Sequence, residues 1–197
     1  MLKKVRVIFV TDGDKIAQQV VEDISAALGL RCISASGGNP TPISGTRIVK
    51  LLKQVPHDPV LVMFDDRGCP EQGNGETAMQ FVAKHPDIEV LGVVAVASNT
   101  IGGIGVPADI CITGQGEFVS STVDKKGKEE YDTIGKPIIY GDTVDILNDL
   151  AVPVVIGVGD IGKMGHSDDL ERGAPITRKA IEEILKRSGI DYEPKNH

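Results

Sequence analysis

Five aspartates follow apolar segments that are expected to form strands, and carboxylates placed there can bind a ligand. They come directly after segments 5–10, 60–64 and 152–158, and they are Asp12, Asp14, Asp65, Asp66 and Asp160. In open α/β sheets, ligands bind outside the carboxyl ends of the strands. Carboxylate oxygens are also the ligands that Mg²⁺ and Ca²⁺ prefer. We predict a ligand site at these five residues, with Asp12, Asp65 and Asp160 as metal ligands for Mg²⁺ or Ca²⁺. The alternative is that the aspartates cap helices and turns.

One pair of these aspartates resembles a known catalytic motif. Asp12-Gly13-Asp14 after a first strand is similar to the haloacid-dehalogenase phosphatases, in which the first Asp is a nucleophile and the second a general acid, with Mg²⁺. The chain departs from that family after Asp14, where Lys15 and Ile16 follow, and it lacks the family's late acidic motif. A phosphatase-like enzyme therefore stays an alternative, and the sequence predicts no catalytic residue otherwise.

A glycine-rich segment follows the last apolar segment. Residues 157–162 (GVGDIG) match the pattern G-x-G-x-x-G, but the expected helix does not begin at the third glycine, so a glycine-rich turn is favoured over a dinucleotide site. Backbone amides of this turn, together with Lys163, could still hold a small anion. Gly159, Asp160 and Lys163 are therefore ligand-binding candidates, provided that those amides are not already paired.

The elements that position these residues alternate between strand-like and helix-like patterns. Apolar segments at 5–10, 32–35, 60–64, 89–97 and 152–158 predict buried strands. Apolar residues spaced three and four apart between them predict amphipathic helices, the first capped by Asp14 and the second by Ser44. We predict a single α/β domain over 1–197, with a mostly parallel, doubly wound (Rossmann-like or flavodoxin-like) sheet and helices on both faces. The turn at Asp124–Gly127 predicts an exposed hairpin excursion around 116–133.

Composition excludes some classes of protein. The chain has 197 residues, 41% of them hydrophobic, and a net charge of −7 with a pI near 5.1, so it is predicted not to bind nucleic acid. Three cysteines without a C-x-x-C pair fit a reducing intracellular compartment. The longest apolar runs are far shorter than a membrane span, which predicts a soluble protein without direct membrane insertion.

Several segments together resemble a known family. They are Phe9 to Asp14, Arg31 to Ser34 with Gly38-Asn39-Pro40, PVLVMFDD at 59–66, IEVLGVVAVAS at 88–98, and VPVVIGVGDIGKM at 152–164. In the same order, and over nearly the whole chain, they are similar to the soluble stage V sporulation protein AE (AE-a form) family. The match is weakest over 99–138.

This resemblance implies a non-enzymatic role. Members belong to the machinery that moves dipicolinic acid, with calcium, into the developing spore and releases it at germination. The expected partners are other stage V sporulation A-operon proteins, and homo-oligomers are left open. The expected location is inside the sporulating cell, peripheral at the spore inner membrane. Docking surfaces are predicted at the Gly102-Gly103 loop, the hairpin and the loop near Met164. A small-molecule sensor that uses the strand-end aspartates is the remaining alternative.

Overall fold

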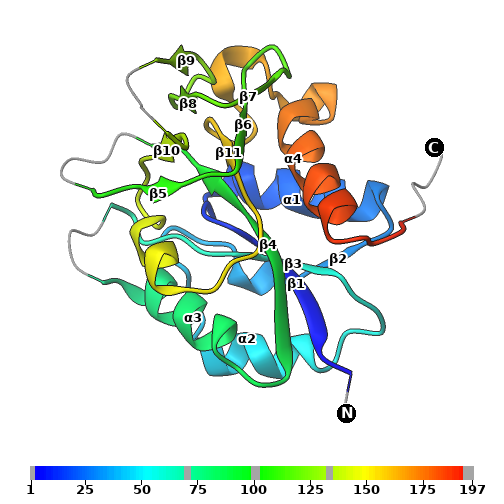
Figure 1. Cartoon of the computed structure of the whole chain (residues 1–197). Coiled ribbons are helices and arrows are strands. Elements are labelled where there is room, and N and C mark those ends of the chain that lie inside the picture. Colours follow the sequence, from blue (N-terminus) through cyan, green and yellow to red (C-terminus); the bar gives the residue numbers. More distant parts are fainter. Residues whose placement is uncertain (1–2, 69–71, 99–102, 132–134, 193–197) are drawn as a thin grey trace.

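A seven-stranded sheet forms the centre of the molecule (Figure 1). The computed structural model describes residues 3–68, 72–98, 103–131 and 135–192. The strand order is β2-β3-β1-β4-β11-β6-β7. All neighbours in the sheet are parallel except β6 and β7, which are antiparallel. The strands are β1 (Val5–Val10), β2 (Arg31–Cys32), β3 (Val60–Met63), β4 (Ile88–Val96), β6 (Ile110–Ile112), β7 (Phe118–Val119) and β11 (Val155–Val158). The predicted mostly parallel sheet is confirmed.

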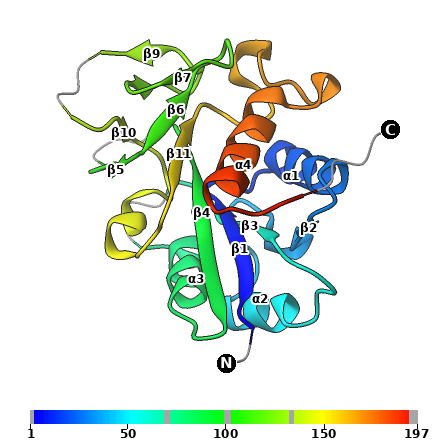
Figure 2. The same cartoon turned by 45° about the vertical axis from the view of Figure 1, so that its right-hand side comes forward.

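Helices cover both faces of this sheet. They are α1 (Lys15–Ala27), α2 (Gly45–Leu52), α3 (Asn74–Ala83) and α4 (Pro175–Arg187). Buried side chains of α1 and α4 pack with Ile8 and Val10 in one apolar cluster. Those of α2 and α3 pack with Val7 and Phe9 in a second cluster, together with the 3₁₀ helix η2 (Asp145–Asp149). Two views separated by 45° show the two helix pairs on opposite sides of β1 and β4 (Figures 1 and 2). The doubly wound arrangement is confirmed.

The alternation of side chains along the central strand explains the two clusters. Successive residues of a strand point to opposite faces, so β1 contributes Val7 and Phe9 to one cluster and Ile8 and Val10 to the other. All four side chains are completely buried. A strand that is apolar on both faces belongs at the centre of a covered parallel sheet, as its continuous hydrophobic pattern predicts.

The region between β4 and β11 adds small antiparallel pairs. β5 (Val106–Pro107) pairs with β10 (Ile138–Ile139), and β8 (Thr122–Val123) pairs with β9 (Glu129–Glu130). The β8–β9 pair and its turn, in which the Gly127 amide donates to the Asp124 carbonyl at 2.9 Å, confirm the predicted hairpin. Thr122 and Val123 are buried, however, so the hairpin is not exposed along its whole length. Residues 132 and 133 lie outside the described part.

One other local prediction differs from the structure. The strand expected over 32–35 is shorter, because the chain turns after Cys32 into the 3₁₀ helix η1 (Ser34–Ser36). Between β11 and α4 the chain forms two further 3₁₀ turns, η3 (Met164–His166) and η4 (Leu170–Arg172). The predicted caps are confirmed: Asp14 accepts from α1 amides and Ser44 from an α2 amide.

Candidate functional site

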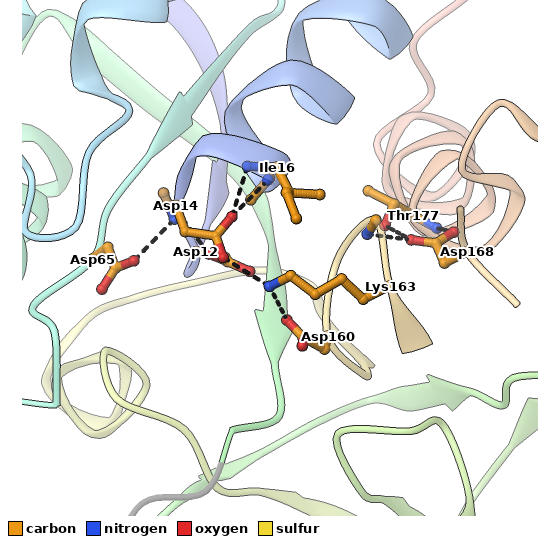
Figure 3. Close-up of polar contacts among 11 residues, drawn as sticks. Asp12, Asp14, Ile16, Asp65, Asp160, Lys163, Asp168 and Thr177 are labelled. Atoms are coloured by element: carbon orange, nitrogen blue, oxygen red, sulfur yellow. Dashed lines mark hydrogen bonds and ion pairs between the residues drawn. The ribbon is translucent and has the colours of Figure 1, made fainter. Parts of the chain in front are cut away.

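Strand-end aspartates gather around one cleft at the carboxyl edge of the sheet. We call this the acidic cleft; it has a volume of about 160 Å³ and is lined by Thr11, Asp12, Asp14, Asn39, Asp65, Val96, Ser98, Asp142 and Asp160. Four of the five predicted aspartates therefore meet, although they come from the ends of β1, β3 and β11. Figure 3 shows the carboxylates of Asp12, Asp14 and Asp160 around the side chain of Lys163.

The topology of the sheet makes this cleft. β1 and β3 are neighbours, and the chain leaves β1 toward α1 on one face but leaves β3 toward α3 on the other. Ligand sites of α/β sheets occur where connections diverge in this way. Gly13 allows the loops to approach closely: its amide donates to Asp65 Oδ2 at 3.3 Å, and a Cβ on Gly13 would lie 2.8 Å from the Gly38 carbonyl.

Asp14 and Asp160 share one lysine. Lys163 Nζ donates to Asp14 Oδ2 at 2.7 Å and to Asp160 Oδ1 at 3.1 Å. Asp14 Oδ1 also accepts from two amides at the start of α1. Burial acts to raise the pKa of Asp14, but the bonds to Lys163 and to the helix amides lower it below its ordinary value. Burial likewise opposes the charge of Lys163, yet its two carboxylate partners raise the pKa of the lysine to about 12. Asp14 is therefore held in the ionised form.

Asp12 has a different environment. Its Oδ1 accepts a 3.1 Å hydrogen bond from the amide of Asp14. Burial, followed by repulsion from the charges of Asp14 and Asp65, raises the pKa of Asp12 to about 7, against the smaller opposing effects of that amide and Lys163. Burial also raises the pKa of Asp65, although the amides of Arg67 and Gly13 donate to it. The cleft therefore combines carboxylates that are stabilised as anions with carboxylates that are not.

Asp66, predicted as a ligand, does not line the cleft. Adjacent residues of an extended chain point in opposite directions, so Asp66 turns away from its neighbour Asp65. Its two oxygens accept from the amides of Gly75 and Glu76, at 2.6 and 2.7 Å, at the start of α3. Asp66 is thus a capping residue of α3, and its prediction as a cleft ligand is corrected.

The glycine-rich turn after β11 also differs from its prediction. The amides of Asp160, Gly162 and Lys163 already donate, to Lys125 O, Asp168 Oδ2 and Asp160 O respectively. Gly159 packs against the hairpin turn, and a Cβ there would lie 2.7 Å from the Lys125 carbonyl. These three amides are therefore not available to donate to an anion. Lys163 contributes to the cleft through its side chain instead.

Five residues that line the cleft were not predicted as site residues from the sequence: Thr11, Asn39, Val96, Ser98 and Asp142. Asn39, Ser98 and Asp142 lie outside the recognised strand-end motif. The amide of Ser98 donates to Tyr140 O, and Ser98 Oγ donates to Asp142 Oδ1 at 2.9 Å, which brings residues 140–142 against the end of β4. This long-range pairing has no local sequence signal.

Asp168 is a second polar centre near the cleft that the sequence did not single out as a site. It is completely buried. Its carboxylate accepts from the amides of Gly162, Ile176 and Thr177 and from the Thr177 hydroxyl, at distances of 2.6–3.1 Å. Figure 3 shows Asp168 and Thr177 on the far side of Lys163 from Asp12. This carboxylate fastens the turn after β11 to the start of α4.

The metal prediction finds no support in the arrangement of side chains. Within the described ranges, no group of three or more His, Cys, Asp or Glu side chains is placed to hold a metal ion, Asp12, Asp65 and Asp160 included. Asp160 is instead paired with Lys163, and Asp65 with two backbone amides. The carboxylates of the cleft can exchange protons and hold cationic groups.

Comparison with known proteins gives one match. The model of a family described as stage V sporulation protein AE1 matches residues 6–188. No curated protein and no solved structure matches the chain. In the part of the chain that the structure describes, no helix is both long and apolar enough to cross a membrane.

Proposed function

This chain belongs to the stage V sporulation protein AE1 family, and we propose that it is a non-enzymatic subunit of the machinery that moves dipicolinic acid, with calcium, into the developing spore. The observation that carries this proposal is the family match, which extends over residues 6–188 of 197. A role in sporulation follows from the family. Dipicolinate uptake, and its release at germination, are the specific functions that we propose.

The geometry of the acidic cleft supports a role as a non-enzymatic subunit more than a role as a phosphatase. A phosphatase of the haloacid-dehalogenase type needs the carboxyl group of Asp14 as a general acid. Here Asp14 caps α1 and pairs with Lys163, and both contacts favour its ionised form. The residues around the cleft thus resemble a structural junction between loops more than a prepared catalytic site.

The proposed partners are the other proteins of the stage V sporulation A operon, and the proposed location is peripheral, at the spore inner membrane. Attachment through protein contacts is consistent with the acidic charge, because a net charge of −7 disfavours binding to anionic lipid. Two of the three docking surfaces expected from the sequence are less exposed than predicted, because Met164 and, in the hairpin, Val123 are buried. Gly102, in the third expected surface, lies outside the described residues.

The docking contact that we propose is formed by Ile104 and Tyr140. Their exposed fractions are 79% and 44%, which is high for large apolar side chains. They lie on the β5–β10 side, where a Cβ on Gly105, the residue after Ile104, would come within 3.0 Å of the Tyr140 ring. We infer that these two exposed apolar side chains, on neighbouring segments, take part in a protein-binding surface.

Deletion of the gene in a spore-forming host tests the transport role. We expect spores with reduced dipicolinate content, measured by terbium fluorescence, and restoration by the intact gene. Normal dipicolinate content and normal release at germination would contradict the proposal.

Complementation with variants tests the docking contact. Ile104→Ser with Tyr140→Ser should fail to restore dipicolinate and should lose co-purification with the other operon proteins. The control is Phe81→Ser, which changes an exposed apolar residue on α3.

A separate assay tests the enzyme alternative. Turnover of a generic phosphoester with Mg²⁺ that is lost in Asp12→Asn would favour an enzyme over a subunit without catalytic activity.

A further inference from the structure

A groove lies between α4 and the end of the central sheet, and it shares no lining residue with the acidic cleft. We call it the α4–β7 groove; it has a volume of about 670 Å³ and is bounded by α4, the edge strand β7 and the segment 189–192. This volume is within the range of protein ligand sites. Its walls differ in chemistry, because α4 contributes charged side chains whereas the other two elements contribute Phe118, Ile190 and Tyr192.

The charged wall is one stripe of α4, formed by residues three and four positions apart. They are Lys179, Glu182, Glu183 and Lys186. Both glutamates are already paired with arginines of the same helix, Glu182 with Arg178 at 3.0 Å and Glu183 with Arg187 at 2.7 Å. Two lysines and two arginines thus face three carboxylates, those of the glutamates and Asp191. The groove is therefore locally cationic on a chain whose net charge is −7.

The two lysines of the stripe are held differently. Lys179 Nζ donates to the carbonyl of Gly116 and lies 4.4 Å from the centre of the Phe118 ring, so its position is fixed. The side chain of Lys186 is 81% exposed, and its nearest carboxylate, that of Glu183, is 3.9 Å away. The groove thus has a fixed cation beside an aromatic ring at one end and a loosely paired cation at the other.

The length of the stripe indicates the shape of an occupant. Lys179 and Lys186 are seven residues apart, which corresponds to about 10 Å along a helix axis. An extended chain advances about 3.3 Å per residue, so about three residues match this length. Alternate side chains of such a chain point in opposite directions. Two carboxylates separated by one residue can therefore face the lysines while the residue between them contacts Phe118 and Ile190.

We propose that the α4–β7 groove binds an extended acidic segment of a partner protein, in which an apolar residue lies between two carboxylates. The charge of the groove favours this occupant, and an apolar side chain would cover Phe118, which is 40% exposed. A second copy of the chain is disfavoured because two molecules with a net charge of −7 repel each other. The proposal concerns a surface separate from the Ile104–Tyr140 contact and does not depend on the transport role.

Titration of the intact ¹⁵N-labelled chain with the peptide acetyl-GELEG-amide tests the proposal by NMR. We expect saturable shifts of the amide resonances of Phe118, Lys179, Lys186 and Ile190. The uncharged analogue acetyl-GQLQG-amide should bind at least about fivefold more weakly, because it cannot pair with the lysines. No saturable binding of the acidic peptide at millimolar concentration, or equal binding of the two peptides, would overturn the proposal. Equal binding of adipate, a small dicarboxylate, would show a small-molecule site instead and would overturn the assignment to a partner segment.

Variants locate the contact. Lys186→Glu should weaken binding of the acidic peptide about five- to tenfold, and its exposed position leaves the fold intact. Phe118→Ser should weaken it about tenfold. The matched control is Lys15→Glu, which makes the same charge change at an exposed position of α1 and should leave binding unchanged. Ile104→Ser with Tyr140→Ser should also retain peptide binding, which separates this surface from the docking contact proposed above. Undiminished binding to Lys186→Glu would contradict the role of the groove.

Discussion

The acidic cleft contains the half-buried Asp12, and the contact between the turn after β11 and the start of α4, which we call the α4 junction, contains the buried Asp168. The two aspartates are stabilised very differently. Asp168 at the α4 junction is completely buried and accepts from four donors. Asp12 in the cleft accepts from one donor and faces two other carboxylates. Burial of a carboxylate is tolerated when donors replace water, and otherwise it favours the neutral acid. One site therefore contributes stability, and the other contributes sensitivity to pH.

Replacement of Asp168 is the most damaging change that we predict. Asp168→Asn keeps the size of the side chain but removes the charge and turns an NH₂ group toward donors. Hydrogen bonds to charged groups contribute more than neutral ones, so the free energy of unfolding should fall by about 3 kcal/mol. Tm should then fall by about 6 to 12 °C.

The matched control for this prediction is Asp169→Asn. Asp169 contacts the exposed side chain of His166, so its replacement should change stability by less than about 0.5 kcal/mol. Equal effects of the two substitutions in a melting experiment would show that the four donors do not distinguish Asp168.

Asp12→Asn should have the opposite sign. The folded pKa of Asp12 is about 7, above its ordinary value, so the folded state binds more protons than the unfolded state between about pH 4 and 7. The stability of the original chain must fall as pH rises through that range, while asparagine does not titrate. We expect similar stability at about pH 4 and a gain of about 2 kcal/mol, or about 4 to 8 °C in Tm, at pH 8, a value reduced for the solvent access of the half-buried Asp12. A variant less stable than the original chain at pH 8 would contradict this reading of the cleft.

Asp58 provides a third case, at the opposite edge of the sheet. Arg6 donates to both of its oxygens, from Nε at 3.1 Å and Nη2 at 2.7 Å. Burial opposes the charge of Asp58, but Arg6 lowers the pKa to about 2. Because this folded pKa lies below the ordinary value, the contribution is present above about pH 4 and is lost as pH falls through 2.

Asp58→Asn should therefore cost about 1.5 kcal/mol at pH 7, a value reduced for solvent access to Arg6, and progressively less in acid. Melting curves at pH 7, 4 and 2.5 would measure this. Lys3→Ala removes a more distant cation at 3.6 Å and serves as the control. A loss that is the same at every pH would mean that packing, and not the charge, is responsible.

Strand-end position predicted which aspartates would meet, because the carboxyl ends of parallel strands lie at one edge of the sheet. Asp12, Asp14, Asp65 and Asp160 were found in this way. The same rule failed for Asp66, since the alternation of side chains sends neighbouring residues to different places. The position of a residue after a strand predicts that it lies at the carboxyl edge of the sheet. It does not predict whether its side chain points into the cleft.

The remaining polar contacts depend on long-range packing. Asp142 reaches the cleft because residues 140–142 pair with Ser98. Asp142 and Ser98 are 44 positions apart along the chain. Asp168 caps α4 from eight residues before Ile176, which is outside the window in which a helix cap is sought. Neither residue has a local pattern that separates it from an ordinary surface aspartate.

Lys163→Met should have the smallest effect on stability but the most direct bearing on the comparison. The lysine side chain is about one-third exposed, so the loss of its two ion pairs should cost less than about 1 kcal/mol. Lys163 also lowers the pKa of Asp12, so without it the midpoint of the Asp12 titration, followed by NMR of its carboxyl ¹³C resonance, should rise above that of the original chain. Arg178→Met, which removes a surface ion pair with Glu182, should leave the midpoint unchanged. If removal of Lys163 did not move the midpoint either, charges in the cleft would not be coupled. The difference between Asp12 and Asp168 would then arise from burial and hydrogen bonding alone.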